Sequence, residues 1–341
     1  MRFRINTNGK DPIYKQLVSQ VEKAVHEGKL KADDQLPSMN DLATELDISR
    51  ETAKKAYGIL TEKGVITPRH GRGFYISDPD NTGRLQILFI LDKFSVYKQI
   101  LLHAFASRLG DSAEITIRIH NQSVDLLEYF LNENLDSYDY YVVAPHFPLD
   151  AETQERVLKQ IKRIPFRKLI MLDRLQPELK GGFGAVYQDF ENDIAYGLAE
   201  GFDSTDKSMK LRVITLPKSL YGQEIHKGIE RFAEENNVSV EFLTSAPDDI
   251  KPGETFLVLN SQLDAGLVDL TQHIQRAGLQ VGKDVFIISY NEFDMNELVL
   301  GGLTTVSTDF RQMGQIAAEM ILNKNLQKVH CQFKMYKRNT F

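Results

Sequence analysis

The chain has 341 residues, of which 42% are hydrophobic and 26% charged, with a formal net charge of −6. This length exceeds that of one ordinary domain, and the composition is typical of a globular protein. Apolar runs such as Ile87 to Leu91 fall far short of the ~20 residues that a membrane-spanning helix needs, so no membrane span is expected. A single cysteine, Cys331, excludes a disulfide framework within the chain and, with no apolar leader at the N-terminus, predicts a cytoplasmic protein.

The charge is unevenly distributed along the chain. Residues 1–77 hold 13 Lys/Arg and 10 Asp/Glu, a formal charge of +3, which leaves −9 for the remainder. A mildly basic N-terminal segment ahead of an acidic body suggests contact with nucleic acid at one end.

The pattern over residues 12–77 predicts three helices and a hairpin. The first helix begins at Pro12, where the missing N–H costs nothing, and ends near Gly28. Ser38 is the predicted N-cap of a second, short helix, and Asp41 three residues later completes a capping box. Ser49 is the predicted N-cap of the third helix. Four apolar residues at helical spacing form its buried stripe: Ala53, Ala56, Tyr57 and Leu60.

Two short β runs follow the third helix, at 65–67 and 74–76, and a basic, glycine-rich tip over 69–73 joins them into a hairpin. Residues 78–84 consist of turn formers without an apolar anchor, which is the composition of a linker. We therefore predict a winged helix-turn-helix domain over 1–77, a linker over 78–84 and a two-lobed sensing domain over 85–341.

The outward face of the third helix is the candidate DNA-reading surface. Arg50 and Glu51 occupy its first turn, the part of a recognition helix that reaches base edges. A capped helix with exposed lysines is by itself most often a solvated surface, but here a tight turn precedes it and a basic hairpin follows it. The candidate DNA-binding residues are Ser38, Ser49, Arg50, Glu51, Thr52, Lys54, Lys55, Arg69, His70 and Arg72.

Several short motifs in this segment occur together, in a fixed order and spacing. They are Pro12-Ile13-Tyr14 with Gln16, Leu36-Pro37-Ser38, Asp41-Leu42-Ala43, Ile48-Ser49-Arg50 with Thr52, Gly64-Val65-Ile66, and Gly71 with Gly73. Residues 10–77 thereby resemble the winged-helix domain of the GntR family of transcription regulators. The resemblance implies operator binding by a homodimer, with Arg50, Thr52 and Lys54 at the groove and Arg72 in the wing. One departure is Asn40, where the family commonly has a DNA-contacting arginine.

From residue 85 onward, short β-rich runs alternate with amphipathic helices. Such alternation predicts βαβ units with parallel sheets, and the number of strands favours two α/β lobes. The predicted strands are 86–91, 115–119, 139–144, 168–172, 211–216, 238–242, 255–259 and 285–289. The predicted helices are 97–109, 123–133, 150–162, 190–201, 220–236, 263–277 and 308–323.

Residues 85–330 resemble the periplasmic-binding-protein-like core of LacI-type regulators. The supporting segments are 170–174, Val186 with Asp189, 278–285, Ile287 with Tyr290-Asn291, and 303–306 followed by a helix with Gly314 and Ala317-Ala318. A GntR-type head on a LacI-type body is a combination that occurs among regulators of sugar catabolism. The resemblance implies a carbohydrate or a derivative as effector, bound between the two lobes.

Ligands of parallel sheets bind beyond the carboxyl ends of the strands. Polar and aromatic side chains near those ends are suited to sugar hydroxyls and to the apolar face of a sugar ring. The candidate ligand-binding residues are Asp92, Phe94, Tyr97, His146, Asp173, Arg174, Asp189, Tyr221, Asn260 and Asn291. Ile225 and Asn291 stand where LacI-type proteins often have Arg and Asp, which indicates a less polar ligand, such as a deoxysugar or a pentose.

Motifs of the common enzyme classes are not found: the sequence has no phosphate-binding loop, no zinc-protease motif and no metal-spaced histidine pair. Cys331 is expected in a core strand rather than as a nucleophile. We predict a transcription regulator that needs no cofactor or metal, acts on double-stranded DNA, and represses until its effector binds. The alternative is a solute-binding or sugar-modifying protein whose winged helix contacts other proteins.

Overall fold

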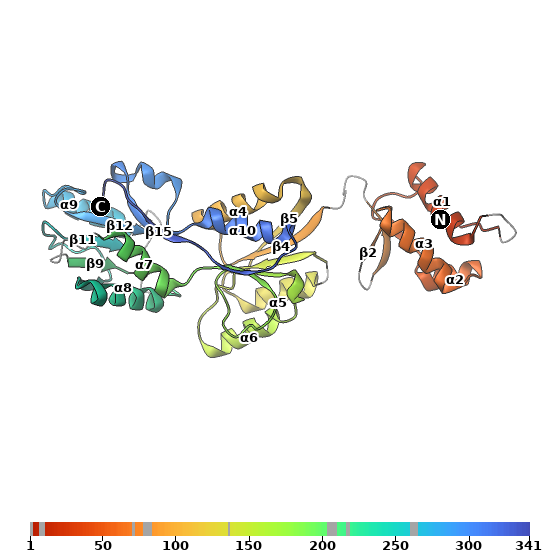
Figure 1. Cartoon of the computed structure of the whole chain (residues 1–341), viewed down its shortest axis with the longest axis horizontal. Coiled ribbons are helices and arrows are strands. Elements are labelled where there is room, and N and C mark those ends of the chain that lie inside the picture. Colours follow the sequence, from red (N-terminus) through yellow and green to blue (C-terminus); the bar gives the residue numbers. More distant parts are fainter. Residues whose placement is uncertain are drawn as a thin grey trace. The chain divides into compact units, whose positions relative to one another are not determined.

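The structure, a computed structural model, describes residues 3–6, 11–69, 72–77, 84–135, 137–202, 210–215, 219–259 and 265–341. The chain forms two compact units (Figure 1). The first extends from the N-terminus to Gln86 and includes Asp111–Glu114 and Asn134–Asp139, and the second holds the remainder. Of the helices described, none is both long and apolar enough to span a bilayer. Most of the predicted linker, 78–83, lies outside the described residues.

The first unit contains three helices and a three-stranded antiparallel sheet, as the sequence predicted except for one short strand. Its elements are α1 (Ile13–His26), β1 (Gln35–Leu36), α2 (Met39–Leu46), α3 (Arg50–Glu62), β2 (Ile66–Arg69) and β3 (Gly73–Ile76). β3 lies between β1 and β2 in the sheet. The sequence analysis missed β1 because two residues are too few to show a periodicity.

Side-chain caps begin both helices of the helix-turn-helix. The Ser38 hydroxyl oxygen accepts the Asp41 N–H at 3.1 Å and donates to the Asp41 carboxylate at 2.6 Å. The Ser49 hydroxyl oxygen accepts the Thr52 N–H at 3.1 Å, so both predicted N-caps are confirmed. The predicted apolar stripe of α3 is confirmed as well, because all four of its residues are buried in the core of this unit.

The second unit consists of two lobes, each built on a six-stranded sheet. Lobe 1 has the strand order β14-β8-β7-β6-β4-β5. Its strands are β4 (Leu85–Leu91), β5 (Ala113–Ile119), β6 (Tyr140–Val143), β7 (Leu169–Asp173), β8 (Gly184–Tyr187) and β14 (Lys328–His330). Its helices are α4 (Val96–Leu109), α5 (Val124–Asn134), α6 (Ala151–Ile161) and α10 (Phe310–Leu322). β7 is buried throughout, as expected for a parallel strand covered on both faces.

Lobe 2 has the strand order β10-β9-β11-β12-β13-β15, in which β15 pairs antiparallel with β13 and the other pairs are parallel. Its strands are β9 (Lys210–Ile214), β10 (Ser239–Leu243), β11 (Thr255–Val258), β12 (Phe286–Tyr290), β13 (Thr304–Thr308) and β15 (Phe333–Tyr336). Its helices are α7 (Phe190–Gly201), α8 (Gly222–Asn236) and α9 (Ala265–Arg276).

All eight strands and seven helices predicted after residue 85 are confirmed, and four strands were missed: β8, β13, β14 and β15. β13 was missed because its sequence, Thr-Thr-Val-Ser-Thr, is polar although every residue of it is buried. The predicted strand at Cys331 is wrong, since this residue lies between β14 and β15 where the chain passes from one lobe to the other.

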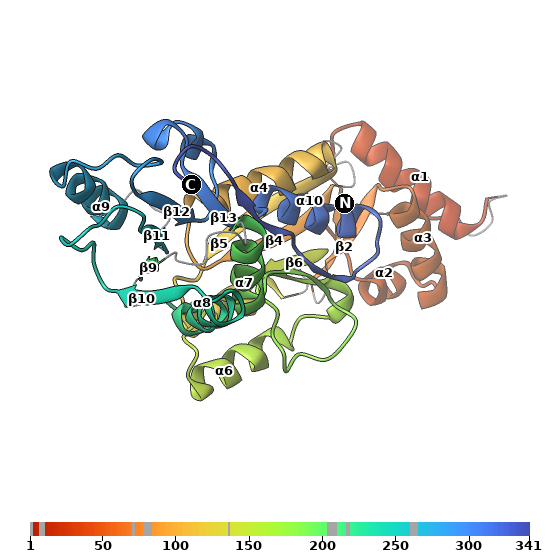
Figure 2. The same ribbon diagram turned by 60° about the vertical axis from the view of Figure 1, so that its left-hand side comes forward.

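The chain crosses between the lobes at three places, two of which directly precede α7 and α10 (Figure 2). The crossovers lie at 188–189, after β8; at Asp309, after β13; and at 331–332, after β14. The Cys331 N–H donates to the Tyr187 carbonyl oxygen at 2.7 Å, and the Asp309 N–H donates to the Gln332 carbonyl oxygen at 2.9 Å. Because β8 and β13 both end at crossovers, the carboxyl ends of the two parallel sheets meet there.

Candidate nucleic-acid interface and candidate ligand site

The outward face of α3 carries exposed charged side chains opposite its buried stripe. Arg50, Glu51, Lys54 and Lys55 are all exposed. Lys54 Nζ lies 3.6 Å from Glu51, and Lys55 Nζ lies 4.1 Å from the centre of the Tyr14 ring of α1. Arg50 takes part in none of the ion pairs formed within the described ranges, so its guanidinium is the one most available to an external partner.

Small residues accompany these cations on the helix. Ser49 and Thr52 bond to each other through their hydroxyl groups at 2.8 Å, at the N-terminus of α3. Gly58, one turn after Lys54, is exposed, and a Cβ built there would meet no atom of the chain within 4 Å. Packing within this unit therefore does not require a glycine at position 58. The missing side chain leaves the outward face of the helix open to a large partner.

The hairpin contributes two arginines of different character. Arg69 forms an ion pair with Asp33 and stacks 4.4 Å from the centre of the Tyr75 ring, so its position is fixed. Arg72 is exposed, while its carbonyl oxygen accepts hydrogen bonds from the side chains of Gln35 at 2.8 Å and Tyr75 at 3.2 Å. The backbone of the wing is thus anchored while the Arg72 side chain reaches solvent. His70, also a predicted contact, lies outside the described residues.

Four predicted ligand residues come together where the two lobes meet. Asp92 follows β4, His146 follows β6, Asp173 ends β7, and Tyr221 precedes α8 of lobe 2. His146 Nε2 lies 2.8 Å from Asp173 Oδ2, and His146 Nδ1 lies 2.7 Å from the Tyr221 hydroxyl. The imidazole therefore links a lobe 1 carboxylate to a lobe 2 phenol, and all four side chains are buried.

Lys98, which the sequence analysis missed, lies at the centre of this cluster. Its ammonium forms an ion pair with Asp173, lies 3.2 Å from His146 Nε2 and 3.8 Å from Asp92 Oδ1, and is 2% exposed. Burial would lower the pKa of Lys98, but the carboxylates of Asp173 and Asp92 outweigh that effect and raise it. Burial would likewise raise the pKa of Asp173, yet Lys98 and His146 hold it well below its usual range.

A signal for Lys98 is present in the sequence. Leu101 and Phe105 follow it by three and seven residues, so it lies on the stripe that buries α4. A lysine on an apolar stripe needs a carboxylate partner, and Asp173 lies 75 residues further along the chain.

Gln188 and Thr308 connect the cluster to the crossovers, and both were missed. The Gln188 side-chain amide donates to Asp173 Oδ1, and the Thr308 hydroxyl donates to Gln188 Oε1 at 2.9 Å. Gln188 belongs to the first crossover and Thr308 ends β13, just before the second. Asp173 thus faces Lys98 and His146 with one oxygen and the crossovers with the other.

The remaining predicted residues have more varied surroundings. Arg174 stacks 5.2 Å from the Tyr221 ring centre, and Tyr97 stacks on Phe310 with ring centres 5.0 Å apart. Phe94 is 52% exposed. Asp189 is the N-cap of α7 and accepts the Asn192 N–H at 3.1 Å. Asn291 follows β12 and has a φ of 73°. Asn260, the last predicted ligand residue, lies outside the described residues.

Several buried polar atoms around the cluster have no hydrogen-bond partner within the described part of the chain. They are Asp92 Oδ1, Ser95 Oγ, Arg174 Nη1, Glu224 Oε2 and the Tyr290 hydroxyl. Burial raises the pKa of Glu224 and of Tyr290, so both favour the protonated form more than usual. Because an unpaired buried polar atom costs ~1–3 kcal/mol, these groups are suited to the hydroxyls of a ligand.

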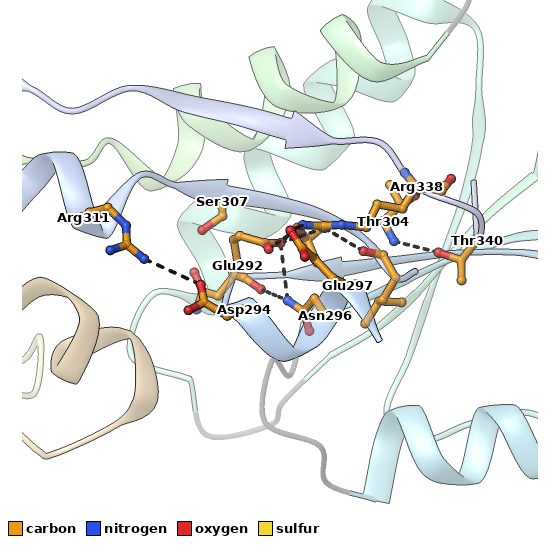
Figure 3. Close-up of polar contacts among 12 residues, drawn as sticks. Glu292, Asp294, Asn296, Glu297, Thr304, Ser307, Arg311, Arg338 and Thr340 are labelled. Atoms are coloured by element: carbon orange, nitrogen blue, oxygen red, sulfur yellow. Dashed lines mark hydrogen bonds and ion pairs between the residues drawn. The ribbon is translucent and has the colours of Figure 1, made fainter. Parts of the chain in front are cut away.

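A second polar cluster fixes the backbone beside Asn291 (Figure 3). Glu292 pairs with Arg338 through two contacts, the shorter 2.8 Å between Oε1 and Nη2, and it also accepts the Thr305 hydroxyl. The side-chain amide of Asn296 donates to the Asn291 carbonyl oxygen at 3.3 Å. Asn296 thereby fixes the carbonyl group of Asn291, while Arg338 of the C-terminal segment holds the neighbouring Glu292.

The N-terminal unit is similar to known bacterial regulators. Residues 13–76 match the family model described as bacterial regulatory proteins, gntR family. The HTH-type transcriptional repressor YtrA of Bacillus subtilis is 33% identical over 102 residues, which are 30% of this chain and 78% of that protein. The chain belongs to the gntR family. The predicted family of the N-terminal segment is confirmed.

The second unit of this gntR-family chain matches a different kind of domain. Residues 210–330 match a model for a periplasmic binding protein-like domain. The arabinose metabolism transcriptional repressor of Geobacillus stearothermophilus is 22% identical over 342 residues, covering 91% of this chain and 90% of that protein. The trehalose repressor of Escherichia coli has a similar fold, with a TM-score of 0.57 and 13% identity over 75% of this chain and 100% of that one. The predicted fold class is confirmed.

Proposed function

We propose that this gntR-family regulator is a homodimeric repressor, and not an enzyme, whose hold on its operator is controlled by a neutral sugar bound between the lobes. The observation that carries the proposal is the buried cluster around Asp173, which joins the carboxyl ends of both sheets to the crossovers. Two relatives support it by name, one a repressor of arabinose metabolism and the other a trehalose repressor.

Two copies of α3 would enter successive major grooves of a near-palindromic operator. Winged-helix and helix-turn-helix dimers bind half-sites about one helical turn, or a multiple of it, apart. Arg50 is assigned to a base edge and Lys54 to phosphate, because Arg pairs bidentately with guanine whereas Lys acts as a point charge. Arg72 in the wing is assigned to the neighbouring backbone or minor groove. The predicted domain bounds, 1–77, 78–84 and 85–341, belong to this proposal.

The charge balance of the cluster favours a neutral ligand. Two cations, Lys98 and Arg174, lie among three carboxyl groups, those of Asp92, Asp173 and Glu224. The cluster therefore has no excess of cations, and a phosphorylated sugar would add buried negative charge to it. The charged residues absent relative to LacI-type proteins indicate a deoxysugar or pentose, but Lys98 adds a buried cation to the site. A neutral sugar fits both observations, with pentoses as the first candidates.

A thermal-shift and calorimetry panel tests the ligand class. The probes are L-arabinose, D-ribose, D-xylose, L-fucose and trehalose, with D-ribose 5-phosphate as the anionic counterpart of D-ribose. A bound sugar at 100 times its dissociation constant stabilises the chain by ~2.7 kcal/mol, which raises the melting temperature by several degrees. The largest shift is expected from a neutral sugar, whereas a preference for the phosphorylated sugar would contradict the proposal.

The DNA-binding part is tested separately. Duplexes selected from a random library by the full chain are expected to share a near-palindromic sequence, and Arg50→Ala is expected to weaken the specific gel shift. Lys63→Ala is the control at the opposite end of the same helix, because Lys63 is the C-cap of α3 and pairs with Glu22 at 2.6 Å. If the parent chain selects no sequence, the alternative of a solute-binding or sugar-modifying protein with a protein-binding winged helix takes precedence.

A further inference from the structure

One ion pair joins the two lobes beside the crossovers and takes no part in the proposed ligand site. Asp193 lies in the first turn of α7, which belongs to lobe 2, and His330 is the last residue of β14 in lobe 1. Asp193 Oδ1 lies 2.7 Å from His330 Nε2, and the side chains are 4% and 47% exposed. The carboxylate is therefore buried while the imidazole is in contact with water.

Backbone hydrogen bonds tie both partners to crossovers. Asp193 Oδ2 accepts the N–H of Asp189, a residue of the first crossover, at 2.7 Å. His330 directly precedes Cys331, whose N–H donates to the carbonyl oxygen of Tyr187 at 2.7 Å. The ion pair thus spans two of the three segments about which the lobes would turn.

We propose that the Asp193–His330 pair is a clasp that holds the two lobes at a fixed angle, and that uptake of a proton by Asp193 loosens it. A protonated Asp193 becomes a weaker acceptor for the imidazole N–H of His330 and for the Asp189 N–H. With Asp193 ionised, both contacts are charge-assisted and the lobes are held.

The electrostatic surroundings place this change near neutral pH. Burial raises the pKa of Asp193 to about 6, against the opposing effects of the Asp189 N–H and of His330. Burial also raises the pKa of Tyr290 and brings that of Cys331 to about 12, so both stay neutral near pH 6. The groups that face the pair are Asp189 from the first crossover, Tyr187 from β8, Tyr290 from β12 and Cys331 from the third crossover.

The angle between the lobes can be measured directly in the chain without effector. Tyr129 on α5 and Val268 on α9 are 57% and 43% exposed, and they lie in lobes 1 and 2. Cysteines introduced at these two positions accept spin labels while Cys331 stays buried. Pulsed electron resonance is expected to give a narrow distance distribution at pH 7.5 and a broader one at pH 5, with a midpoint near pH 6.

Three variants separate the clasp from other titrating groups. Asp193→Asn is expected to remove the pH dependence, and His330→Leu, which removes the N–H donor to Asp193, to broaden the distribution at pH 7.5. His273→Gln is the matched control, because His273 pairs with Asp248 at 3.3 Å within lobe 2, away from the crossovers. A distribution that is equal at pH 5 and 7.5, or an unchanged midpoint in Asp193→Asn, would overturn the proposal.

A second measurement needs no variant and covers the case in which Asp193→Asn does not fold. Hydrogen exchange of the Asp189 and Cys331 amides, corrected for intrinsic rates, is expected to be about tenfold more protected at pH 7.5 than at pH 5, the factor that ~1.4 kcal/mol represents. Equal protection at the two pH values would refute the clasp. Neither experiment uses a sugar or DNA, so both stand if the proposed function fails.

Discussion

The two units place the same types of charged residue in opposite environments. On α3, Arg50 and Lys54 stand exposed on a helix whose stability comes from caps and an apolar stripe on its other side. Between the lobes, Lys98 and Asp173 are buried and depend on each other. The comparison teaches that a charge available to a partner can be removed with little harm to the fold, whereas a charge that completes a buried cluster cannot.

The largest effect is expected from breaking the buried pair. Lys98→Met leaves the carboxylates of Asp173 and Asp92 in the interior without a cation, which should cost ~3–5 kcal/mol of unfolding free energy, measured by urea denaturation. Adding Asp173→Asn should recover much of the loss, because it removes one of the two uncompensated charges. A single variant as stable as the parent would show that the pair is not coupled.

The next effect concerns pH and a buried histidine beside the cluster. Burial lowers the pKa of His120 to about 4, and the ring stacks on Phe147 with centres 4.0 Å apart. The unfolded chain takes up the proton near pH 6.5 and the folded chain only near pH 4, so stability should fall by ~3 kcal/mol as the pH drops through this range. His120→Gln should flatten that part of the curve of melting temperature against pH.

Features of the exposed helix could be predicted from the sequence, whereas the partners within the buried cluster could not. The caps Ser38 and Ser49 and the stripe of α3 are local features, and each was predicted because every partner lies within four residues. Lys98 was missed because its partner is 75 residues away, and Gln188 because Thr308 is 120 residues away. β13 was missed because buried threonines in a sheet interior do not show in a hydropathy pattern. Long-range pairing, rather than composition, defines the buried cluster.

A smaller effect is expected at the exposed face. Arg50→Ala should weaken binding to the selected operator by ~1–3 kcal/mol and relax its sequence preference at one position, measured by fluorescence anisotropy. Lys54→Ala should weaken binding to all duplexes equally, whatever their sequence, and reduce the slope of log affinity against log salt concentration by ~1. Neither change should move the melting temperature, because both side chains are exposed. A lower melting temperature with unaltered operator affinity would reverse the assigned roles.

The smallest effect tests the helix cap that presents those side chains. Ser49→Ala removes the acceptor of the Thr52 N–H and should cost ~1 kcal/mol in the stability of the first unit, seen as an earlier thermal transition. Ser49→Asp keeps an acceptor at the helix N-terminus and should restore the stability. Because the aspartate adds negative charge beside the operator, the DNA affinity of Ser49→Asp should fall below that of the parent chain. Equal stability in all three proteins would mean that solvent caps the helix.

The order of strands along the chain has a consequence for synthesis on the ribosome. β14 and β15, which complete the edges of the two sensor sheets, are the last strands of the chain, whereas the winged helix uses only early residues. Because domains fold in the order in which they emerge, the DNA-reading head can mature while both sensor lobes still lack an edge. A truncated translation product would therefore have a folded DNA-binding unit but incomplete sensor lobes. It would compete for the operator, and the effector could not release it.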